Sequence, residues 1–414
     1  MGSRQSIKWV VMIKRSDLVH EVEHQLLGLK ESDTGYERDL LLKLQPQTKT
    51  HALIITGIRR CGKSTLMRQL INKTGKKAFF LNFDTPRLYN FEMVDFEFID
   101  THIIETKSKA LFFDEIQVVQ GWELYVRKKL DEGYQVVVTG SNASLMSREL
   151  GTKLTGRNIT AELFPFSYRE YCKFNALKPG KASLADYVST GGFPEFVKTH
   201  NQEIHAALID DLLYRDIAVR HNLRDIRSLK QLLTFLAVNT GCLVSATKLT
   251  QILTVKSTAT VLEYFGFFEQ AYLVQFVPKF SWSYKVQLVN PRKVYFIDNG
   301  LLNGMTASFS DNDGRKLENM VFWELRRSQY EIYYYNEKSK ECDFVVCKKN
   351  KVIHLIQVCF RLTGDNESRE TESLLEAMEF FGMKEGIIIT FDQSDTILRK
   401  GKRISVIPAY DFPF

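Results

Sequence analysis

Apolar and polar positions alternate in blocks along the first 160 residues, and these blocks predict strands and helices in turn. Short apolar runs, each long enough for one buried strand, occur at 51–56, 78–84, 110–113 and 134–139. Between the first two runs, segment 65–71 has its apolar residues at helical spacing. Strands that alternate with helices predict a parallel sheet covered on both faces, which is the α/β class.

The pattern changes beyond residue 164. Segment 165–219 has helical stretches interrupted by Gly191 and Gly192, and it predicts a small helical lid. Three short amphipathic segments and two β-like segments follow, at 229–237, 245–253, 256–265, 272–277 and 293–297. Three helices and a hairpin in this order are typical of a winged helix-turn-helix. We therefore predict four domains, at 13–164, 165–225, 226–297 and 298–414.

The composition fits packed domains, and the net positive charge leaves open whether the protein binds nucleic acid. The chain has 414 residues, 44% of them hydrophobic, which is too long for one core and too apolar for disorder. It has no apolar run of roughly 20 residues and no signal-peptide core, so we expect a cytoplasmic protein without a membrane partner. The net charge of +7 permits an anionic partner. The basic clusters at 127–129, 348–351 and 399–403 either touch nucleic acid or are solvated faces, the commoner case.

Residues 57–64, Gly-Ile-Arg-Arg-Cys-Gly-Lys-Ser, stand between a predicted strand and a predicted helix. This order and the GxxxxGK[ST] spacing are those of a phosphate-binding loop. Glycine lets the backbone N–H groups approach phosphate, Lys63 would reach the β- and γ-phosphates, and the Ser64 hydroxyl would ligate Mg²⁺. The predicted ligands are therefore ATP and Mg²⁺. The candidate nucleotide-binding residues are Gly57, Arg59, Arg60, Cys61, Gly62, Lys63, Ser64 and Thr65, with Cys61 as a filler of the loop.

Two carboxylates, Asp114 and Glu115, follow the predicted strand 110–113. Ligands of open α/β sheets bind at this end of the strands. We expect Asp114 to hold Mg²⁺ opposite Ser64 and Glu115 to act as general base toward the attacking water. The next strand runs into Gly140-Ser141-Asn142, where Ser141 or Asn142 is the candidate to contact that water or the γ-phosphate.

Taken together with Leu154-Thr155-Gly156-Arg157 and the segments 163–171, 191–194 and 214–217, these motifs resemble those of the predicted AAA+ superfamily ATPases of archaea and bacteria. In that family an ATPase module precedes a C-terminal domain of unknown function. The resemblance extends over nearly the whole chain from about residue 13. It implies that Arg157 contacts the γ-phosphate, in its own subunit or in a neighbour. The alternative is that Arg157 forms an ion pair that fixes the end of the domain.

The predicted winged helix would present the start of its third helix to a DNA groove. The residues at that position are Lys256, Ser257, Thr258 and Thr260. This set is only mildly basic, and winged helices also act as protein–protein scaffolds, so DNA and a protein partner both remain open.

The C-terminal region resembles the PD-(D/E)XK restriction-endonuclease-like core. Glu318 falls on a predicted helix and Asp343 begins a predicted strand, but Gln357 and Cys359 stand where a second acid and a lysine belong. Metal-assisted cleavage needs carboxylate ligands and a cation beside the attacking water. We therefore expect this fold without the reaction.

The sequence thus predicts an ATPase that couples hydrolysis to conformational change in the winged-helix and nuclease-like part, either on DNA or not. The alternatives are a nucleotide-gated protein–protein switch and an ATP-coupled nuclease. A homo-oligomer or a protein partner is compatible with each of them.

Overall fold

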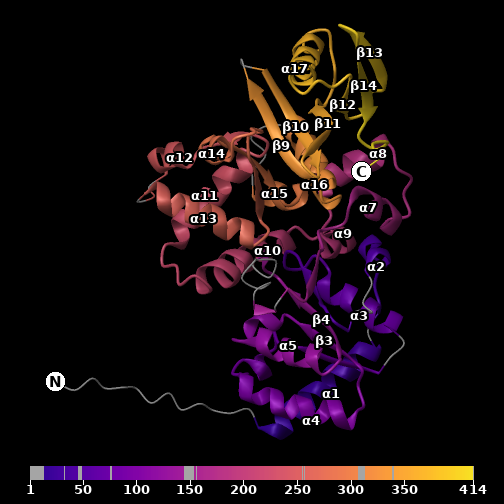
Figure 1. The fold of residues 1–414 in the computed structure, drawn as a ribbon, viewed down its shortest axis with the longest axis vertical. Coiled ribbons are helices and arrows are strands. Elements are labelled where there is room, and N and C mark those ends of the chain that lie inside the picture. Colours follow the sequence, from indigo (N-terminus) through magenta and orange to yellow (C-terminus); the bar gives the residue numbers. More distant parts are fainter. Residues whose placement is uncertain are drawn as a thin grey trace, which may run out of the picture. The chain divides into compact units, whose positions relative to one another are not determined.

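The computed structural model describes residues 14–31, 33–44, 49–74, 77–143, 153–154, 156–253, 255, 257–305, 313–337 and 340–413 (Figure 1). The chain forms two compact units, one of residues 1–57 and 62–163 and the other of residues 58–61 and 164–414. Residue 13, where the first predicted domain begins, and Lys256 of the predicted DNA-contacting helix lie outside the described residues.

The first unit is built on a five-stranded parallel sheet with the order β2-β3-β4-β1-β5. The strands are β1 Ala52–Thr56, β2 Ala78–Asn82, β3 Ala110–Asp114, β4 Gln135–Gly140 and β5 Asn158–Glu162. Every residue of β1, β3 and β4 is buried, as expected for central strands covered on both faces. The α/β parallel sheet is confirmed. β5 was not predicted, because it is a polar edge strand with one buried residue.

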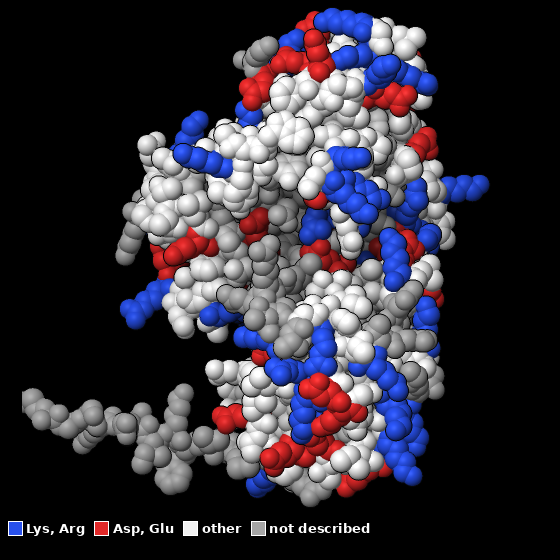
Figure 2. Space-filling model, viewed as in Figure 1, with Lys and Arg blue, Asp and Glu red and all other residues white. Residues whose placement is uncertain are grey.

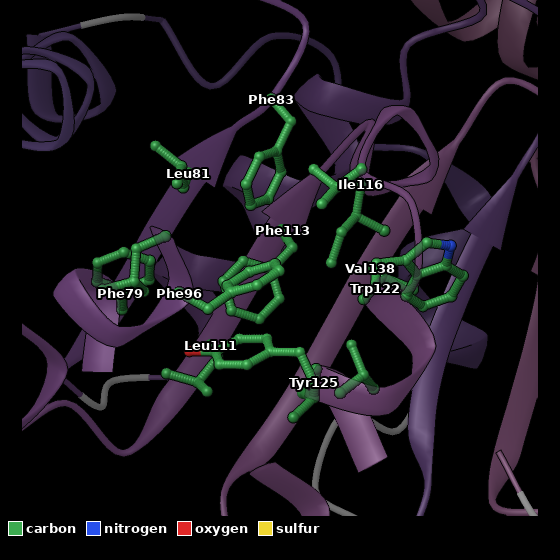
Figure 3. Close-up of a cluster of buried hydrophobic side chains, with 14 of the residues drawn as sticks. Phe79, Leu81, Phe83, Phe96, Leu111, Phe113, Ile116, Trp122, Tyr125 and Val138 are labelled. Atoms are coloured by element: carbon green, nitrogen blue, oxygen red, sulfur yellow. The ribbon is translucent and has the colours of Figure 1, made fainter. Parts of the chain in front are cut away.

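In the described part of this unit the helices are α1 Arg15–Glu31, α2 Asp39–Lys43, α3 Lys63–Thr74, α4 Phe96–Glu105 and α5 Trp122–Asp131. Short 3-10 turns are η1 Pro86–Leu88, η2 Met93–Asp95 and η3 Ile116–Val118. An aromatic core lies on one side of the sheet (Figure 3). The rings of Phe96 and Tyr125 stack with centroids 3.7 Å apart, and Phe113 meets Tyr125 edge-on. Since Phe113 directly precedes Asp114, this packing fixes the end of β3 from which the carboxylate projects.

The second unit begins with helices α7 Tyr168–Phe174, α8 Lys181–Thr190, α9 Pro194–Thr199 and α10 Glu203–Asp211, followed by a π-helical segment, η5 Leu212–Val219. The turn at residues 191–194 docks this segment onto the later chain. The Gly192 N–H donates to Asp298 Oδ2 at 2.6 Å, and a Cβ at Gly192 would lie 2.2 Å from the Phe166 carbonyl oxygen. Phe193 is buried in the turn. The role of residues 165–225 as a nucleotide lid stays a prediction.

The next elements are α11 Ile226–Val238, α12 Ala246–Ile252, α13 Thr258–Gln270, α14 Tyr284–Val289 and α15 Asn299–Met305. They accompany a small antiparallel sheet of β6 Leu243–Val244, β8 Arg292–Phe296 and β7 Val274–Val277. The predicted three helices and two strands form near the expected positions. Whether they make a winged helix in function stays a prediction.

The C-terminal part has a six-stranded mixed sheet with the order β13-β14-β12-β11-β10-β9. Its strands are β9 Glu331–Glu337, β10 Lys340–Lys348, β11 Lys351–Val358, β12 Glu385–Thr390, β13 Asp395–Arg399 and β14 Lys402–Pro408, and its helices are α16 Asp313–Arg327 and α17 Glu367–Phe380. Within the described ranges, no helix combines the length and apolar character needed to cross a membrane.

Candidate nucleotide site

The phosphate-loop motif forms the turn between β1 and α3. Its backbone needs glycine, since φ is +154° at Gly57 and +102° at Gly62, values that other residues rarely adopt. Helix α3 begins at Lys63, so its first N–H groups lack partners within the helix and face the loop. Such a helix start is suited to bind a phosphate anion.

The Lys63 ammonium contacts both the phosphate loop and Glu115. Its Nζ donates to the Gly57 carbonyl oxygen at 3.0 Å and lies 3.4 Å from Glu115 Oε1. The side chain is 4% exposed. A buried lysine whose ammonium contacts the loop backbone is a candidate to bind phosphate oxygens.

Asp114 lies fully buried at the carboxyl end of β3. The Thr139 hydroxyl donates to its Oδ1. Burial raises the pKa of Asp114, as does the neighbouring Glu115 charge, whereas the Thr139 and Ser64 hydroxyls and the Lys63 ammonium oppose the rise. Among the residues described, none donates a hydrogen bond to its Oδ2.

These groups fit a magnesium ion. Asp114 and Ser64 line the same cavity of about 310 Å³, and a carboxylate and a hydroxyl are the oxygen ligands that Mg²⁺ takes. A cation there would meet the unpartnered oxygen of Asp114 and offset the cost of burying its charge.

Hydrogen bonds hold Glu115 in place in addition to its ion pair with Lys63. Its backbone is left-handed, with φ of +52°, and its N–H donates to Thr139 Oγ1 at 3.0 Å. Its Oε2 accepts from the Ser141 N–H at 3.2 Å and from Gln117 Nε2 at 2.5 Å. Thr139 therefore contacts both carboxylate residues.

The turn after β4 is buried against this site. Ser141 and Asn142 are 1% and 5% exposed. In the described part of the chain, nothing hydrogen-bonds to the Ser141 hydroxyl. Both residues therefore remain candidates for contact with the attacking water or the γ-phosphate.

The side chains of the two arginines in the loop, Arg59 and Arg60, form ion pairs with aspartates. Residues 58–61 belong by their contacts to the second unit. There Arg59 makes a bidentate pair with Asp216 at 3.1 and 3.2 Å, and Arg60 pairs with Asp211 at 3.0 Å. Their prediction as nucleotide-binding residues stays a prediction.

One segment beside α3 was not predicted. Gln69 Nε2 donates to the carbonyl oxygens of Thr34 and Tyr36, at 2.9 and 2.7 Å. A Cβ at Gly35 would lie 2.8 Å from the Thr65 methyl group, and a Cβ at Gly62 would lie 3.5 Å from the buried Arg38 guanidinium. Segment 34–38 thus flanks the loop and the start of α3. No motif marks it in the sequence.

The sheet register bears on the two roles considered for Arg157. The parallel register pairs Ala52 with Asn158, so Arg157 lies at the amino edge of the sheet, whereas the phosphate loop follows the carboxyl end of β1. Five strand residues, at about 3.3 Å each, separate these edges. Arg157 instead forms an ion pair with Asp131 at 2.7 Å. The structure therefore does not bring it to the γ-phosphate of its own subunit, and the alternative of an ion pair at the domain's end fits.

Family models and relatives match most of this chain. A model described as an AAA domain matches residues 49–172, and two domains of unknown function match residues 181–312 and 313–412. An uncharacterized protein of Methanocaldococcus jannaschii is 33% identical over 393 residues, covering 89% of this chain and 87% of that protein. An uncharacterized protein of Haemophilus influenzae is 30% identical over 347 residues, with 78% and 85% covered.

Two solved structures are similar in part. DnaA from Aquifex aeolicus bound to AMPPCP is 13% identical, covers 60% of this chain and 88% of its own, and has a TM-score of 0.28. C. elegans PCH-2 is also 13% identical, with 42% and 46% covered and a TM-score of 0.25. Both scores indicate only weak structural similarity. The identity to the archaeal and bacterial proteins, by contrast, shows that the chain belongs to their family, and its N-terminal part is an AAA domain, the domain of nucleotide-binding ATPases.

Proposed function

We propose that the first unit binds ATP with Mg²⁺ and hydrolyses it. One observation carries this proposal: the Thr139 hydroxyl contacts both Asp114 and the backbone of Glu115, and so holds the two carboxylate residues beside Lys63. A carboxylate for the metal, a second one for water and a cation for phosphate are the parts that phosphoryl transfer to water requires.

Each residue then has a distinct task. Ser64 and Asp114 would hold Mg²⁺, which when bound offsets the charge on the β- and γ-phosphates. Lys63 would bind phosphate oxygens. Glu115 would accept a proton from the attacking water while the water oxygen bonds to the γ-phosphorus and the bond to the bridging oxygen of ADP breaks.

The ion pair between Lys63 and Glu115 suggests an order for these events. A bound phosphate would compete with Glu115 for the Lys63 ammonium, because contacts of Nζ with phosphate oxygens would weaken its ion pair with Glu115. Once Lys63 turns to the phosphate, the Glu115 carboxylate is released to accept the proton. Its contact with the Ser141 N–H keeps it at the end of β4 during this change.

Nucleotide binding tests the first half of the proposal. We expect Lys63→Ala to weaken ATP binding by at least about tenfold, because a buried cation beside the phosphates is lost. Lys73→Ala is a matched control on the exposed last turn of the same helix. Equal ATP affinity of the Lys63 variant and wild type, measured by titration calorimetry with Mg²⁺, would contradict the assignment of residues 57–64 as a phosphate-binding loop.

The target of the ATPase is a separate question. On the face visible in Figure 2, Lys and Arg are interspersed with Asp and Glu, so DNA and a protein partner both remain candidates. Turnover stimulated by double- or single-stranded DNA would support action on DNA. Turnover unaffected by DNA, with nucleotide-dependent sizing, would support a protein–protein or oligomeric switch, and metal-dependent DNA cleavage would support the nuclease alternative.

A further inference from the structure

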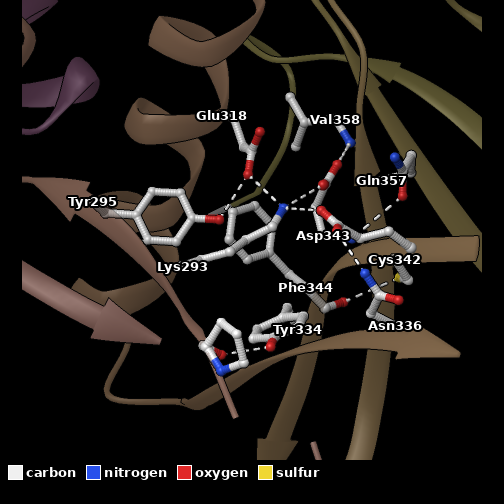
Figure 4. A network of polar contacts seen from close by, with 12 residues as sticks. Lys293, Tyr295, Glu318, Tyr334, Asn336, Cys342, Asp343, Phe344, Gln357 and Val358 are labelled. Carbon is white, nitrogen blue, oxygen red and sulfur yellow. Dashed lines mark hydrogen bonds and ion pairs between the residues drawn. The ribbon is translucent and has the colours of Figure 1, made fainter. Parts of the chain in front are cut away.

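A buried ammonium lies where three carboxylates of the second unit converge (Figure 4). Lys293, on β8, is fully enclosed. Its Nζ lies 2.7 Å from Asp343 Oδ1, 2.7 Å from Glu341 Oε1 and 3.0 Å from Glu318 Oε1. These acids come from β10 and α16, so the lysine joins three separate elements of the fold.

The outer contacts of the cluster hold the carboxylates toward the ammonium. The Tyr295 hydroxyl donates to Glu318 Oε1 at 2.7 Å, and the Val358 N–H donates to Asp343 Oδ2 at 2.8 Å. Burial and the Asp343 charge raise the pKa of Glu318 to about 7. Burial alone would lower the pKa of Lys293, but Asp343 and Glu318 raise it well above its usual range. All three carboxylates therefore lie within ion-pair distance of the one ammonium.

The residues that a nuclease-like metal site would need are turned to other partners. Gln357 Oε1 accepts from the Asp343 N–H at 3.3 Å, while its Nε2 donates to Glu370 at 2.9 Å. The Cys359 thiol is directed to the Arg361 carbonyl oxygen at 3.1 Å. Neither side chain completes a coordination shell with Asp343 and Glu318. The residues present therefore do not fit a divalent cation, because an ammonium already takes the point at which the carboxylates meet.

We propose that the Lys293 ammonium permanently replaces a divalent cation in this cluster, so that the second unit is held together without metal and cleaves no nucleic acid there. Three carboxylates around one enclosed point are a suitable ligand set for a divalent cation once the ammonium is gone. Removal of the lysine side chain should therefore create a metal site where the natural protein has none. The proposal is independent of ATP hydrolysis in the first unit.

Manganese binding to the full-length, nucleotide-free chain tests this proposal, with Mn²⁺ alone as the probe in titration calorimetry. We expect Lys293→Met to bind one more Mn²⁺ per chain than wild type. Adding Asp343→Asn should weaken that site by at least about tenfold, since an anionic ligand becomes neutral. Lys279→Met is the matched control, because the Lys279 ammonium pairs with the half-exposed Glu337 at 2.8 Å, and it should gain no site.

Lys293→Met leaves Asp343, Glu318 and Glu341 without their cation and can therefore fail to fold. In that case we expect Mn²⁺ to restore its native circular dichroism, and a failure of Mn²⁺ to do so would contradict the proposal. A folded Lys293→Met protein without the extra site would also overturn it. So would an Mn²⁺ site in the wild-type chain that Asp343→Asn removes, because that result would show metal beside the native lysine.

Discussion

The Lys63 ammonium and the Glu115 carboxylate form an ion pair at 3.4 Å, inside a site where the lysine also binds the loop carbonyl of Gly57 at 3.0 Å. This relationship joins the phosphate loop after β1 to the acidic end of β3, although β4 lies between these strands in the sheet. The pair connects the group expected to bind phosphate with the group expected to accept the proton of water.

Thr139 offers a test of how the two carboxylate residues are held. Thr139→Val removes the hydroxyl that contacts Asp114 and the Glu115 N–H while it keeps the shape of the side chain. We expect the free energy of unfolding to fall by about 1–3 kcal/mol, because buried polar groups lose their partner. We also expect kcat for ATP to fall at least about tenfold. Thr139→Ser should restore most of both, and a fully active Thr139→Val enzyme would show that the hydroxyl positions nothing.

The two arginine pairs of the loop differ in burial and should differ in strength. Asp216 is 5% exposed and binds Arg59 with two hydrogen bonds, whereas the side chains of Arg60 and Asp211 are each about one-third exposed. In double-mutant cycles to alanine, we expect a coupling energy of about 1–3 kcal/mol for the first pair and below about 1 kcal/mol for the second. Urea unfolding measures both, and equal coupling energies would contradict this ranking.

Because His205 is buried, we expect the free energy of unfolding to fall in acid. Its ring stacks on Phe196 with centroids 3.9 Å apart, and burial lowers its pKa to about 4. Since the unfolded chain binds this proton near pH 6.5, the stabilisation is complete above that pH and is lost as the pH falls toward 4. The full effect is at most about 3 kcal/mol.

The matched comparison for this prediction is His205→Gln. Asp298 and Glu318 have raised pKa values, of about 6 and about 7, and therefore act in the opposite sense. Only the difference between wild type and variant isolates His205. We expect that difference in the free energy of unfolding to shrink between pH 6.5 and pH 4, and parallel pH profiles would be incompatible with a neutral buried histidine.

Arg157 can be tested for a role in its own subunit. Its side chain is 28% exposed and pairs with the exposed Asp131, so we expect Arg157→Ala to cost less than about 1 kcal/mol of stability. At protein concentrations where sizing shows a monomer, turnover should stay within about threefold of wild type. A tenfold loss in the monomer would place the guanidinium at its own nucleotide, against the sheet register.

Those parts of the site that are local in sequence could be predicted. Lys63, Ser64, Asp114 and Glu115 each stand directly at the end of a strand or the start of a helix, and parallel strands bring such ends to one edge. Arg157 could not be placed from the sequence. Its distance from the phosphate loop depends on the direction of β5 in the sheet, which decides at which edge the residue before β5 lies. Lys293 carried no signal, since a single lysine in a strand becomes informative only when its partners from α16 and β10 are known.

The long-range partners of the loop were equally hidden. Arg59 reads as a loop residue in the sequence, and Asp216 lies in a helical segment 157 residues later. Pairing between such positions depends on tertiary packing, which local periodicity does not contain.

ATP turnover of Glu115→Gln, measured beside its nucleotide affinity, tests the central claim most directly. Glutamine keeps the size of the side chain but cannot accept a proton from water. We predict ATP binding within about threefold of wild type and a fall in kcat of at least about 100-fold, with Glu105→Gln, an exposed residue at the end of α4, unchanged. Wild-type turnover by Glu115→Gln would contradict the account.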